Sequence, residues 1–375
     1  MAAVRYHTGR FPPDDRLDWR MLIPFIGPAA AAVARYEGML AAMPNPDVLL
    51  APLTTQEAVL SSRIEGTEAT MGDVLGFEAG QEPESPARRD DIQEVLNYRS
   101  AMRRAEELLA ELPLSLRVVR EAHEVLLRGV RGEGKAPGEF RRTPNWIGPP
   151  GCTIEQATFV PVGADRLPDA VSEWERYMHT DAPDRLVQLA ILHAEFEALH
   201  PFLDGNGRLG RMLVPLFLWQ CGLIQTPRFY ISAFFESRRD AYYEGLLAVS
   251  RNDDWTGWCR FFLEAVRVQA EDNLTKARGI FTLYDDMKRR VAELTRSRYA
   301  IHALDWIFQY PIFKGAHFAA HAGIPAKTAR RLLSLLREGG IVKTLIPGRG
   351  RQAAIFGYPD VLNVAEGRMV LDAHL

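Results

Sequence analysis

The sequence has few cysteines, namely Cys152, Cys221 and Cys259 in 375 residues. An odd number gives no disulfide framework, and their spacing matches no metal-binding pattern. The N-terminus lacks the apolar core of a signal peptide, and no apolar run is long enough to cross a membrane. These absences favour a reducing, cytoplasmic setting and argue against the disulfide-rich secreted and membrane-spanning classes.

A strong excess of one charge is also missing. The formal net charge is −3, which argues against general attraction to nucleic acid or membranes but leaves room for a local basic patch. Hydrophobic residues make up 47% and charged residues 25%, as is ordinary for a globular protein. A chain of 375 residues is expected to form two or three domains.

The most informative stretch is His-Pro-Phe-Leu-Asp-Gly-Asn-Gly-Arg-Leu-Gly-Arg, at residues 200–211. Apolar residues at helical spacing predict a helix over 184–199, and the apolar run 208–221 predicts another. The twelve residues therefore form a tight loop between two buried helices.

This placement suits the binding of phosphate groups. Unpaired N–H groups and the positive end of the dipole make the start of a helix an anion site. Gly205 and Gly207 let the backbone approach a bound group, and Arg208 and Arg211 can hold successive phosphates. Asp204 offers the hard oxygen that Mg²⁺ prefers.

His200, at the exit of the first helix, can take a proton from an incoming hydroxyl. Each part alone is weak, since a lone histidine is usually structural and Asp-Gly-Asn-Gly is usually a turn. The whole string is far more specific and matches the Fic signature, His-Pro-Phe-x-Asp/Glu-Gly-Asn-Gly-Arg-x-x-Arg, without departure. The chain therefore resembles the Fic family of nucleotidyl transferases, most of which move AMP from ATP onto a protein hydroxyl.

The resemblance assigns roles within the loop. It implies that His200 is the general base for a target Ser, Thr or Tyr hydroxyl, and that Asp204 holds Mg²⁺. It implies that the nucleotide is bound by Gly205, Asn206, Gly207, Arg208, Gly210 and Arg211.

A second motif lies near the N-terminus. A helix is predicted from a threonine cap at 54 or 55 to Gly66, which places Glu65 at the negative end of the dipole at a cost of about 0.3–1 kcal/mol. For an arbitrary sequence this would be a solvated surface residue. However, Ser61-x-x-x-Glu65-Gly66 resembles the Fic inhibitory motif, which implies that Glu65 pairs with Arg211 and makes ATP bind unproductively.

Residues 138–162 predict a hairpin beside the loop, with a strand over 153–162. In Fic proteins the equivalent hairpin is a flap that presents the target by strand addition, so the resemblance implies a target strand at Thr158, Phe159 and Val160. A plain surface hairpin is the alternative. Tyr242 and Tyr243 are candidates for contact with adenine, and a core role is an equal alternative for each.

Other segments carry simpler expectations. Helices are expected over 29–43, 91–112, 115–127, 167–179, 255–266 and 270–298, with a loop over 77–90 and a kink or restart at Pro215. The helical pattern His193-x-x-x-Glu197-x-x-His200 invites a metal site. A structural hydrogen bond from His193 is favoured instead.

The C-terminal region has the pattern of a winged helix. Helices are expected over 301–308, 315–322 and 326–337, and strands over 341–345 and 353–356. Its basic residues are candidates for DNA contact, with packing or protein docking as the alternative: Lys327, Arg330, Arg331, Arg349 and Arg351.

The predicted fold is mainly α, a helical Fic core with a short β-hairpin flap, plus a C-terminal winged-helix domain. The expected parts are an N-terminal helical region (1–112) with an inhibitory helix at about 54–66, a catalytic core (113–270), a connecting helix (271–298) and the winged helix (299–375).

The predicted function is a cytoplasmic protein adenylyltransferase that uses ATP and Mg²⁺, modifies a target protein or itself, and is inhibited by Glu65. A homodimer is possible, and no membrane partner is expected. Three alternatives stay open: removal of AMP, transfer of another nucleotide, and a DNA-binding regulator whose Fic fold senses nucleotide.

Overall fold

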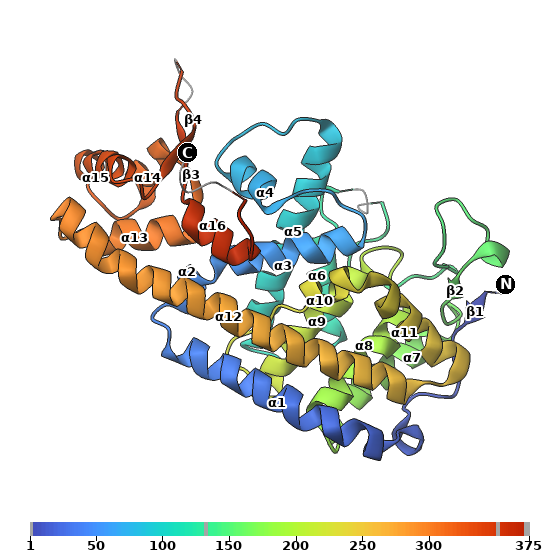
Figure 1. The fold of residues 1–375 in the computed structure, drawn as a ribbon. Helices are drawn as coiled ribbons and strands as arrows, with labels where there is room; N and C mark the ends of the chain where they lie inside the picture. The colour runs from blue at the N-terminus through green and yellow to red at the C-terminus, as the bar shows by residue number, and fades with distance from the viewer. Residues whose placement is uncertain (1–2, 131–133, 350–352, 371–375) are drawn as a thin grey trace. The chain divides into compact units, whose positions relative to one another are not determined.

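The computed structural model describes residues 3–130, 134–349 and 353–370 and is mainly helical (Figure 1). The chain forms two compact units, each built from three stretches of sequence. The first contains Met1–Glu37, Leu60–Thr67 and Leu96–Glu271, and the second contains Gly38–Val59, Glu68–Val95 and Asp272–Leu375. Among the described residues, no helix combines the length and apolarity that crossing a membrane requires.

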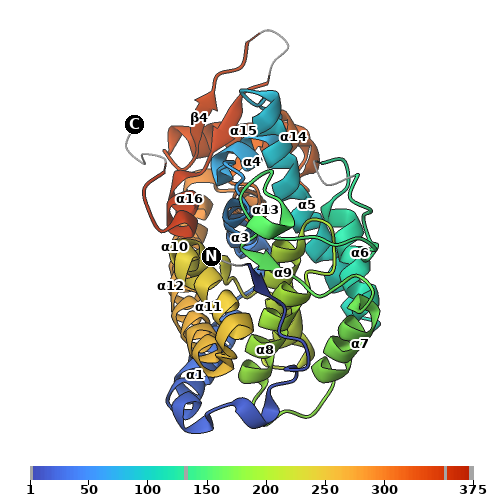
Figure 2. The ribbon, with the colours of Figure 1, turned by 90° about the vertical axis from the view of Figure 1, so that its right-hand side faces the viewer.

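Two antiparallel neighbours, α8 (Arg185–Leu199) and α9 (Asn206–Gln220), form the centre of the first unit (Figure 2). The Asp184 carboxylate caps α8 by accepting the N–H of Val187 at 2.9 Å. Both helices are buried on almost every side, as their apolar sequences predicted. Helix α9 continues through Pro215, so the expected restart does not occur.

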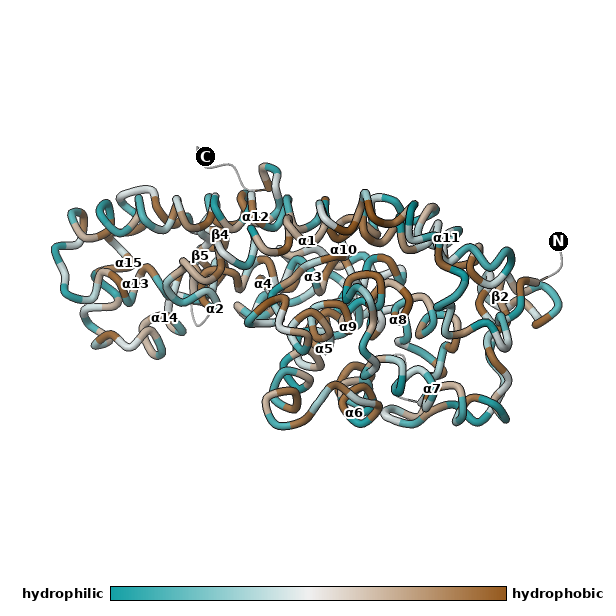
Figure 3. Tube along the Cα trace, turned by 90° about the horizontal axis from the view of Figure 1, so that it is seen from below, coloured by the Kyte–Doolittle hydropathy of each residue, from teal (hydrophilic) through white to brown (hydrophobic). Residues whose placement is uncertain are grey.

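Further helices of the first unit surround this pair: α6 (Leu116–Leu126), α7 (Leu167–Met178), α10 (Ser232–Ser237) and α11 (Arg239–Asn252). Figure 3 shows hydrophobic positions gathered along α8 to α10. The two helices expected over 255–266 and 270–298 are one continuous helix, α12 (Trp255–Thr295). No proline interrupts it, and apolar residues recur along its whole length.

The N-terminal helices begin earlier than expected. Helix α1 (Trp19–Ala42) runs through Pro24 and Pro28, because complete burial of residues such as Leu22 and Ala29 outweighs the lost backbone hydrogen bonds.

After the short α2 (Pro46–Leu49), α3 (Ala51–Ile64) starts before the predicted threonine cap. The hydroxyls of Thr54 and Thr55 donate to carbonyls four residues earlier, so they are satisfied inside the helix.

The loop expected over 77–90 is shorter in the structure. Helix α4 (Met71–Glu78) has a capping box between Thr70 and Asp73. Helix α5 (Pro86–Leu109) starts on a proline, whose missing N–H costs nothing there. Only residues 79–85 connect the two helices.

The C-terminal part of the second unit contains α13 (Ala300–Gln309), α14 (Gly315–His321), α15 (Ala326–Glu338) and an antiparallel sheet. The sheet order is β3-β5-β4, formed by Ile312–Lys314, Ile355–Gly357 and Lys343–Ile346. Three helices and two strands were predicted here and are confirmed to within two residues. Strand β3 and α16 (Pro359–Glu366) were not predicted.

Candidate functional site

The loop between α8 and α9 is held by its own side chains. His200 ends α8 in the left-handed conformation, with φ 46°, and Gly205, with φ 75°, precedes α9. The Asn206 side chain accepts the N–H of Phe202 and donates to its carbonyl, each at 2.9 Å. Asn206 therefore fixes the shape of the loop through its side chain.

His123 of α6 supports the loop from the core. Its ring stacks on the buried Phe202, with centroids 3.8 Å apart. Its Nδ1 accepts the N–H of Gly138 at 2.8 Å, so Nε2 is the protonated nitrogen that donates to the carbonyl of Asp204 at 3.0 Å. Burial lowers the pKa of His123 to about 4, which keeps the ring neutral.

Arg141 holds the end of α8. Its buried guanidinium donates to the carbonyls of His200 at 2.9 Å and Leu199 at 3.1 Å, and also to those of Thr143 and Val162. Burial lowers its pKa to about 10, so it stays charged at the negative end of the helix dipole.

A carboxylate already lies at the start of α9. Glu65 Oε1 accepts a hydrogen bond from Nη2 of the buried Arg211 at 2.7 Å. The same guanidinium donates to the hydroxyl of Ser61 at 2.9 Å and to its carbonyl at 2.8 Å. Burial alone would raise the pKa of Glu65, but Arg211, helped by Arg208 and His200, holds that pKa below its usual value.

Gly207 makes room for this carboxylate. A Cβ at this position would lie 2.2 Å from Glu65 Oε1 and 3.1 Å from Arg211 Nη1. With any other residue here the Glu65 carboxylate would have to shift, so the glycine allows the anion to lie this close to the helix start. Gly66, with φ 99°, ends α3 directly after Glu65.

The His200 ring is half-buried beside this pair. Its pKa is lowered to about 4, chiefly by burial and also by Arg141, while Glu65 and Asp204 act in the opposite direction. The ring is therefore neutral near pH 7. Its buried Nδ1 has no hydrogen-bond partner among the described residues.

Asp204 is the exposed acid of the loop, with 42% of its side chain accessible. Its Oδ1 accepts the N–H of Gly205 at 2.6 Å and lies 3.8 Å from Nη2 of Arg208, whose side chain is buried. Within the described residues there is no group of three His, Cys, Asp or Glu that could hold a metal unaided.

A cavity of about 300 Å³ lies between the hairpin, α8 and α11. Its lining is mostly apolar and consists of Ile147, Gly148, Thr158, Phe159, Ala194, Glu197, Ala198, Tyr243, Leu246 and Leu247.

The two tyrosine candidates differ in their surroundings. Tyr243 lines the cavity and is 37% exposed. Tyr242 is buried, its ring stacks on Phe235, and its hydroxyl contacts His193 Nε2 at 2.9 Å. Tyr242 is therefore a core residue that cannot reach a base, and Tyr243 alone remains a candidate.

Gly210, on α9, packs closely against His193 and Glu197 of α8. Nδ1 of His193 donates to the carbonyl of Gly210 at 3.1 Å, which confirms the structural hydrogen bond expected of this histidine. A Cβ at Gly210 would lie 2.3 Å from Glu197 Oε1. Gly210 thus serves the close packing of α8 on α9.

The hairpin strand is shorter than predicted, comprising β2 (Phe159–Val160) after a short helical turn at Ile154–Gln156. Ile147 pairs with Phe159 in the antiparallel sense, while β1 (Val4–Arg5) pairs with β2 in parallel. Both edges of the strand expected to receive a target are therefore occupied by this chain.

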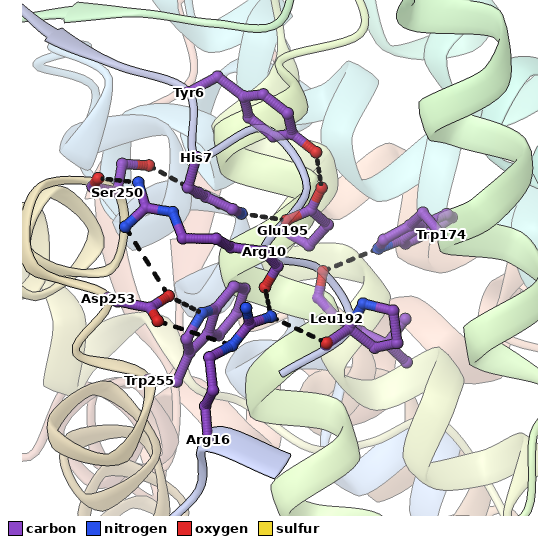
Figure 4. Close-up of polar contacts among 11 residues, drawn as sticks. Tyr6, His7, Arg10, Arg16, Trp174, Leu192, Glu195, Ser250, Asp253 and Trp255 are labelled. Carbon is purple, nitrogen blue, oxygen red and sulfur yellow. Dashed lines mark hydrogen bonds and ion pairs between the residues drawn. The ribbon is translucent and has the colours of Figure 1, made fainter. Parts of the chain in front are cut away.

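A buried network anchors the segment that follows β1 (Figure 4). Tyr6 donates to Glu195 Oε1 at 2.7 Å, and His7 Nε2 lies 2.7 Å from Glu195 Oε2. The other ring nitrogen of His7 lies 2.8 Å from the hydroxyl of Ser250. The N-terminal segment thereby ties α8 to α11.

The candidate DNA contacts lie in the second unit. Lys327, Arg330 and Arg331 are exposed on α15, away from its buried face of Ala329, Leu332, Leu333 and Leu336. Arg349 is exposed after β4, and Arg351 lies outside the described residues.

Comparison with known proteins agrees with this arrangement. Residues 23–107 match the family described as Fic/DOC family N-terminal, and residues 113–218 match the Fic/DOC family, together just over half of the chain. Protein adenylyltransferase Fic of Drosophila grimshawi is 26% identical over 180 residues, and that of Drosophila virilis is 28% identical over 180 residues. Each alignment covers 47% of this chain and 33% of the relative, so the chain spans about a third of the relatives' length.

Solved structures show the same fold. A Fic family protein from Desulfovibrio desulfuricans superposes with a TM-score of 0.56 at 21% identity, covering 90% of this chain and 95% of the other. Fic-1 (residues 134–508) of C. elegans has a TM-score of 0.54 at 17% identity, covering 70% and 75% of the two chains. The family matches over residues 23–107 and 113–218, together with the intact loop signature, show that the chain belongs to the Fic/DOC family.

Proposed function

We propose that this chain is a protein adenylyltransferase that transfers AMP from ATP to a hydroxyl of a target protein or of itself, and that Glu65 inhibits it. The observation that carries the proposal is the Glu65 carboxylate on Arg211 and against Gly207. A bound carboxylate at a helix start is a stand-in for a phosphate. It occupies the position where the end of a triphosphate would bind.

The chemistry follows from the neighbouring groups. The neutral His200 takes the proton from the target hydroxyl as its oxygen attacks the α-phosphorus. The new oxygen–phosphorus bond forms while the bond to pyrophosphate breaks. N–H groups at the start of α9, with Arg208 and Arg211, stabilise the negative charge of the phosphates.

Asp204 is the candidate ligand for magnesium. Mg²⁺ is commonly held by one or two carboxylates together with substrate phosphates and water. Both contacts of Asp204 use Oδ1, which leaves Oδ2 for a cation that arrives with ATP. When bound, the ion would neutralise charge on the phosphates.

The apolar cavity beside the loop is the candidate site for adenine. It lies between the hairpin and α11, and Tyr243 offers an aromatic face to a base. A target segment cannot add to β2 unless β1 leaves, so the exposed Trp146 and Ile147, in the segment that faces β2, are better candidates for target contact.

The proposal is tested by incubating the protein with radiolabelled ATP and Mg²⁺ and locating AMP by mass spectrometry. Glu65→Gly should increase labelling by at least about tenfold, which corresponds to about 1.4 kcal/mol. His200→Ala in the Glu65→Gly background should reduce labelling by about 10²–10⁴-fold, the contribution of a general base.

Equal labelling of the wild type and Glu65→Gly would contradict inhibition by Glu65. Labelling by UTP or GTP in preference to ATP would show that another nucleotide is transferred. Release of AMP from a labelled protein by the wild type, lost in Glu65→Gly, would show instead that Glu65 serves the reverse, hydrolytic reaction.

We also propose that residues 299–375 form a winged helix that binds DNA. The chain order of its helices and antiparallel strands suits that fold, and the exposed basic residues of α15 offer phosphate contacts.

A further inference from the structure

Arg211 creates an electrostatic problem for any state in which Glu65 has left. The guanidinium is completely buried and cannot lose its proton at physiological pH. An unpaired charge in such a place is strongly destabilising. In the wild type the charge is balanced by Glu65, whose Oε1 lies 2.7 Å from Nη2 of Arg211. Release of that carboxylate would leave Arg211 without a counter-ion before ATP binds.

A second carboxyl group lies on the same face of α9. Gly207 and Gly210 are three residues apart and therefore neighbours on the helix surface. Glu65 Oε1 lies against Gly207, and Glu197 Oε1 lies against Gly210. Arg211 and Glu65 both act electrostatically on Glu197. Among the described residues, no basic nitrogen lies within 4 Å of Glu197, so it is not a partner of Arg211 in the inhibited state.

The surroundings of Glu197 favour its neutral form while Glu65 is present. Oε1 is buried without a hydrogen-bond partner. The carboxyl group contacts the Tyr242 hydroxyl, but the only hydrogen of that hydroxyl goes to His193 Nε2, because Nδ1 of His193 donates to Gly210. Burial, with a contribution from Glu65, raises the pKa of Glu197 to about 7 against the opposing effect of Arg211.

We propose that Glu197 is the reserve counter-ion of Arg211, held more protonated while Glu65 occupies the site and ionised once Glu65 leaves. Removing Glu65 withdraws a negative charge that opposes ionisation and exposes Glu197 to the full charge of Arg211. Glu197 then loses a proton, stabilises the empty released state and keeps Arg211 in place until the triphosphate arrives. Glu197 is thus a positioning residue that acts through Arg211, and its role in the enzyme rests on the proposed inhibition by Glu65.

A double-mutant cycle tests the inference without requiring catalysis. Glu65→Gln and Glu197→Gln each remove one charge at constant shape, and glutamine mimics a protonated glutamate. Alone, Glu197→Gln should change the melting temperature little. In the Glu65→Gln background it should lower the melting temperature by on the order of 5 °C beyond the sum of the single effects. ATP with Mg²⁺ should restore part of this loss by supplying another counter-ion.

A matched control is Glu244→Gln, which removes an exposed carboxylate paired with Arg251. Its effect on the melting temperature should add to that of Glu65→Gln.

Infrared spectroscopy at about pH 6 measures the protonation of Glu197 directly. The protonated carboxyl band that Glu197→Gln abolishes should weaken in Glu65→Gln. Additive melting shifts, or an unchanged band, would overturn the inference. The two proposals can fail separately. If the double-mutant cycle gives the expected melting shifts but ATP labels no protein, the counter-ion role of Glu197 stands and the proposed transferase function is wrong.

Discussion

At the scale of single residues, burial sets the charges on which the site depends. His123 and His200 both have a pKa lowered to about 4, with burial as the largest cause. Neutral rings are required by the contacts that His123 makes and by the base role proposed for His200. Arg211 holds the pKa of Glu65 below its usual value, against the opposite effect of burial.

His123 gives a prediction about stability and pH. Its pKa of about 4 in the folded chain lies below the value of about 6.5 in the unfolded chain. Between these pH values the unfolded chain binds a proton at His123 and the folded chain does not. The contribution to stability is complete above about pH 6.5 and falls as the pH drops toward 4, reaching a loss of about 2 kcal/mol by about pH 5.

The test compares thermal unfolding of the wild type and His123→Gln at about pH 7.5 and pH 5. The amide can replace both hydrogen bonds but binds no proton, so the variant should lose less stability on acidification. His321→Gln, at an exposed position, is the control. An equal acid sensitivity of wild type and His123→Gln would show that His123 does not carry this linkage.

At the scale of elements, the N-terminal segment is part of the first unit rather than a loose arm. Strand β1 completes the pairing of β2, and the residues after it hold Glu195 of α8 and Ser250 of α11 (Figure 4). Glu195 lies on the helix that ends at His200. The segment therefore stabilises the helix that carries the proposed base.

His7→Leu should destabilise the first unit by about 2–4 kcal/mol, because it leaves the buried carboxylate of Glu195 and the hydroxyl of Ser250 with unsatisfied hydrogen bonds. The loss is measured as a shift in the urea midpoint followed by circular dichroism. Thr8→Ala, at the exposed neighbouring position, should leave the midpoint unchanged. A midpoint for His7→Leu equal to that of Thr8→Ala would mean that the network does not stabilise the fold.

At the scale of the whole molecule, the net charge of −3 hides a local concentration of positive charge on α15. Lys327, Arg330 and Arg331 are exposed there, while the opposite face of the helix is buried. The proposed DNA interaction would therefore depend on this helix rather than on the general charge of the chain.

Binding of duplex DNA should weaken steeply as salt rises, because each phosphate contact releases counterions. Replacing both Arg330 and Arg331 with alanine should lower affinity and reduce the salt slope by about two. Fluorescence anisotropy with labelled duplexes measures both quantities. Replacing Arg89 and Arg289, exposed basic residues of the second unit outside residues 299–375, is the control. Affinity that does not depend on salt, or survives loss of both arginines, would exclude this role.

Much of the fold could be predicted because its helices are long and periodic. The helices that flank residues 200–211 and the first three helices of the C-terminal region were placed within a few residues, whereas α16 was not predicted. Predictions failed where burial outweighs a local preference, as at Pro24 and Pro28 in α1, and where a break was expected inside the single long α12.

The sequence by itself determined the signature at residues 200–211 and the Ser61–Gly66 motif, because both are defined by short, fixed spacings. Only the tertiary structure decided that His123 and Arg141 support the loop, that Tyr243 rather than Tyr242 faces the cavity, and that the N-terminal segment covers β2. It also placed Glu65 on Arg211, a pair that only family resemblance had implied. These choices depend on burial and on contacts between residues far apart in the chain, which no local spacing encodes.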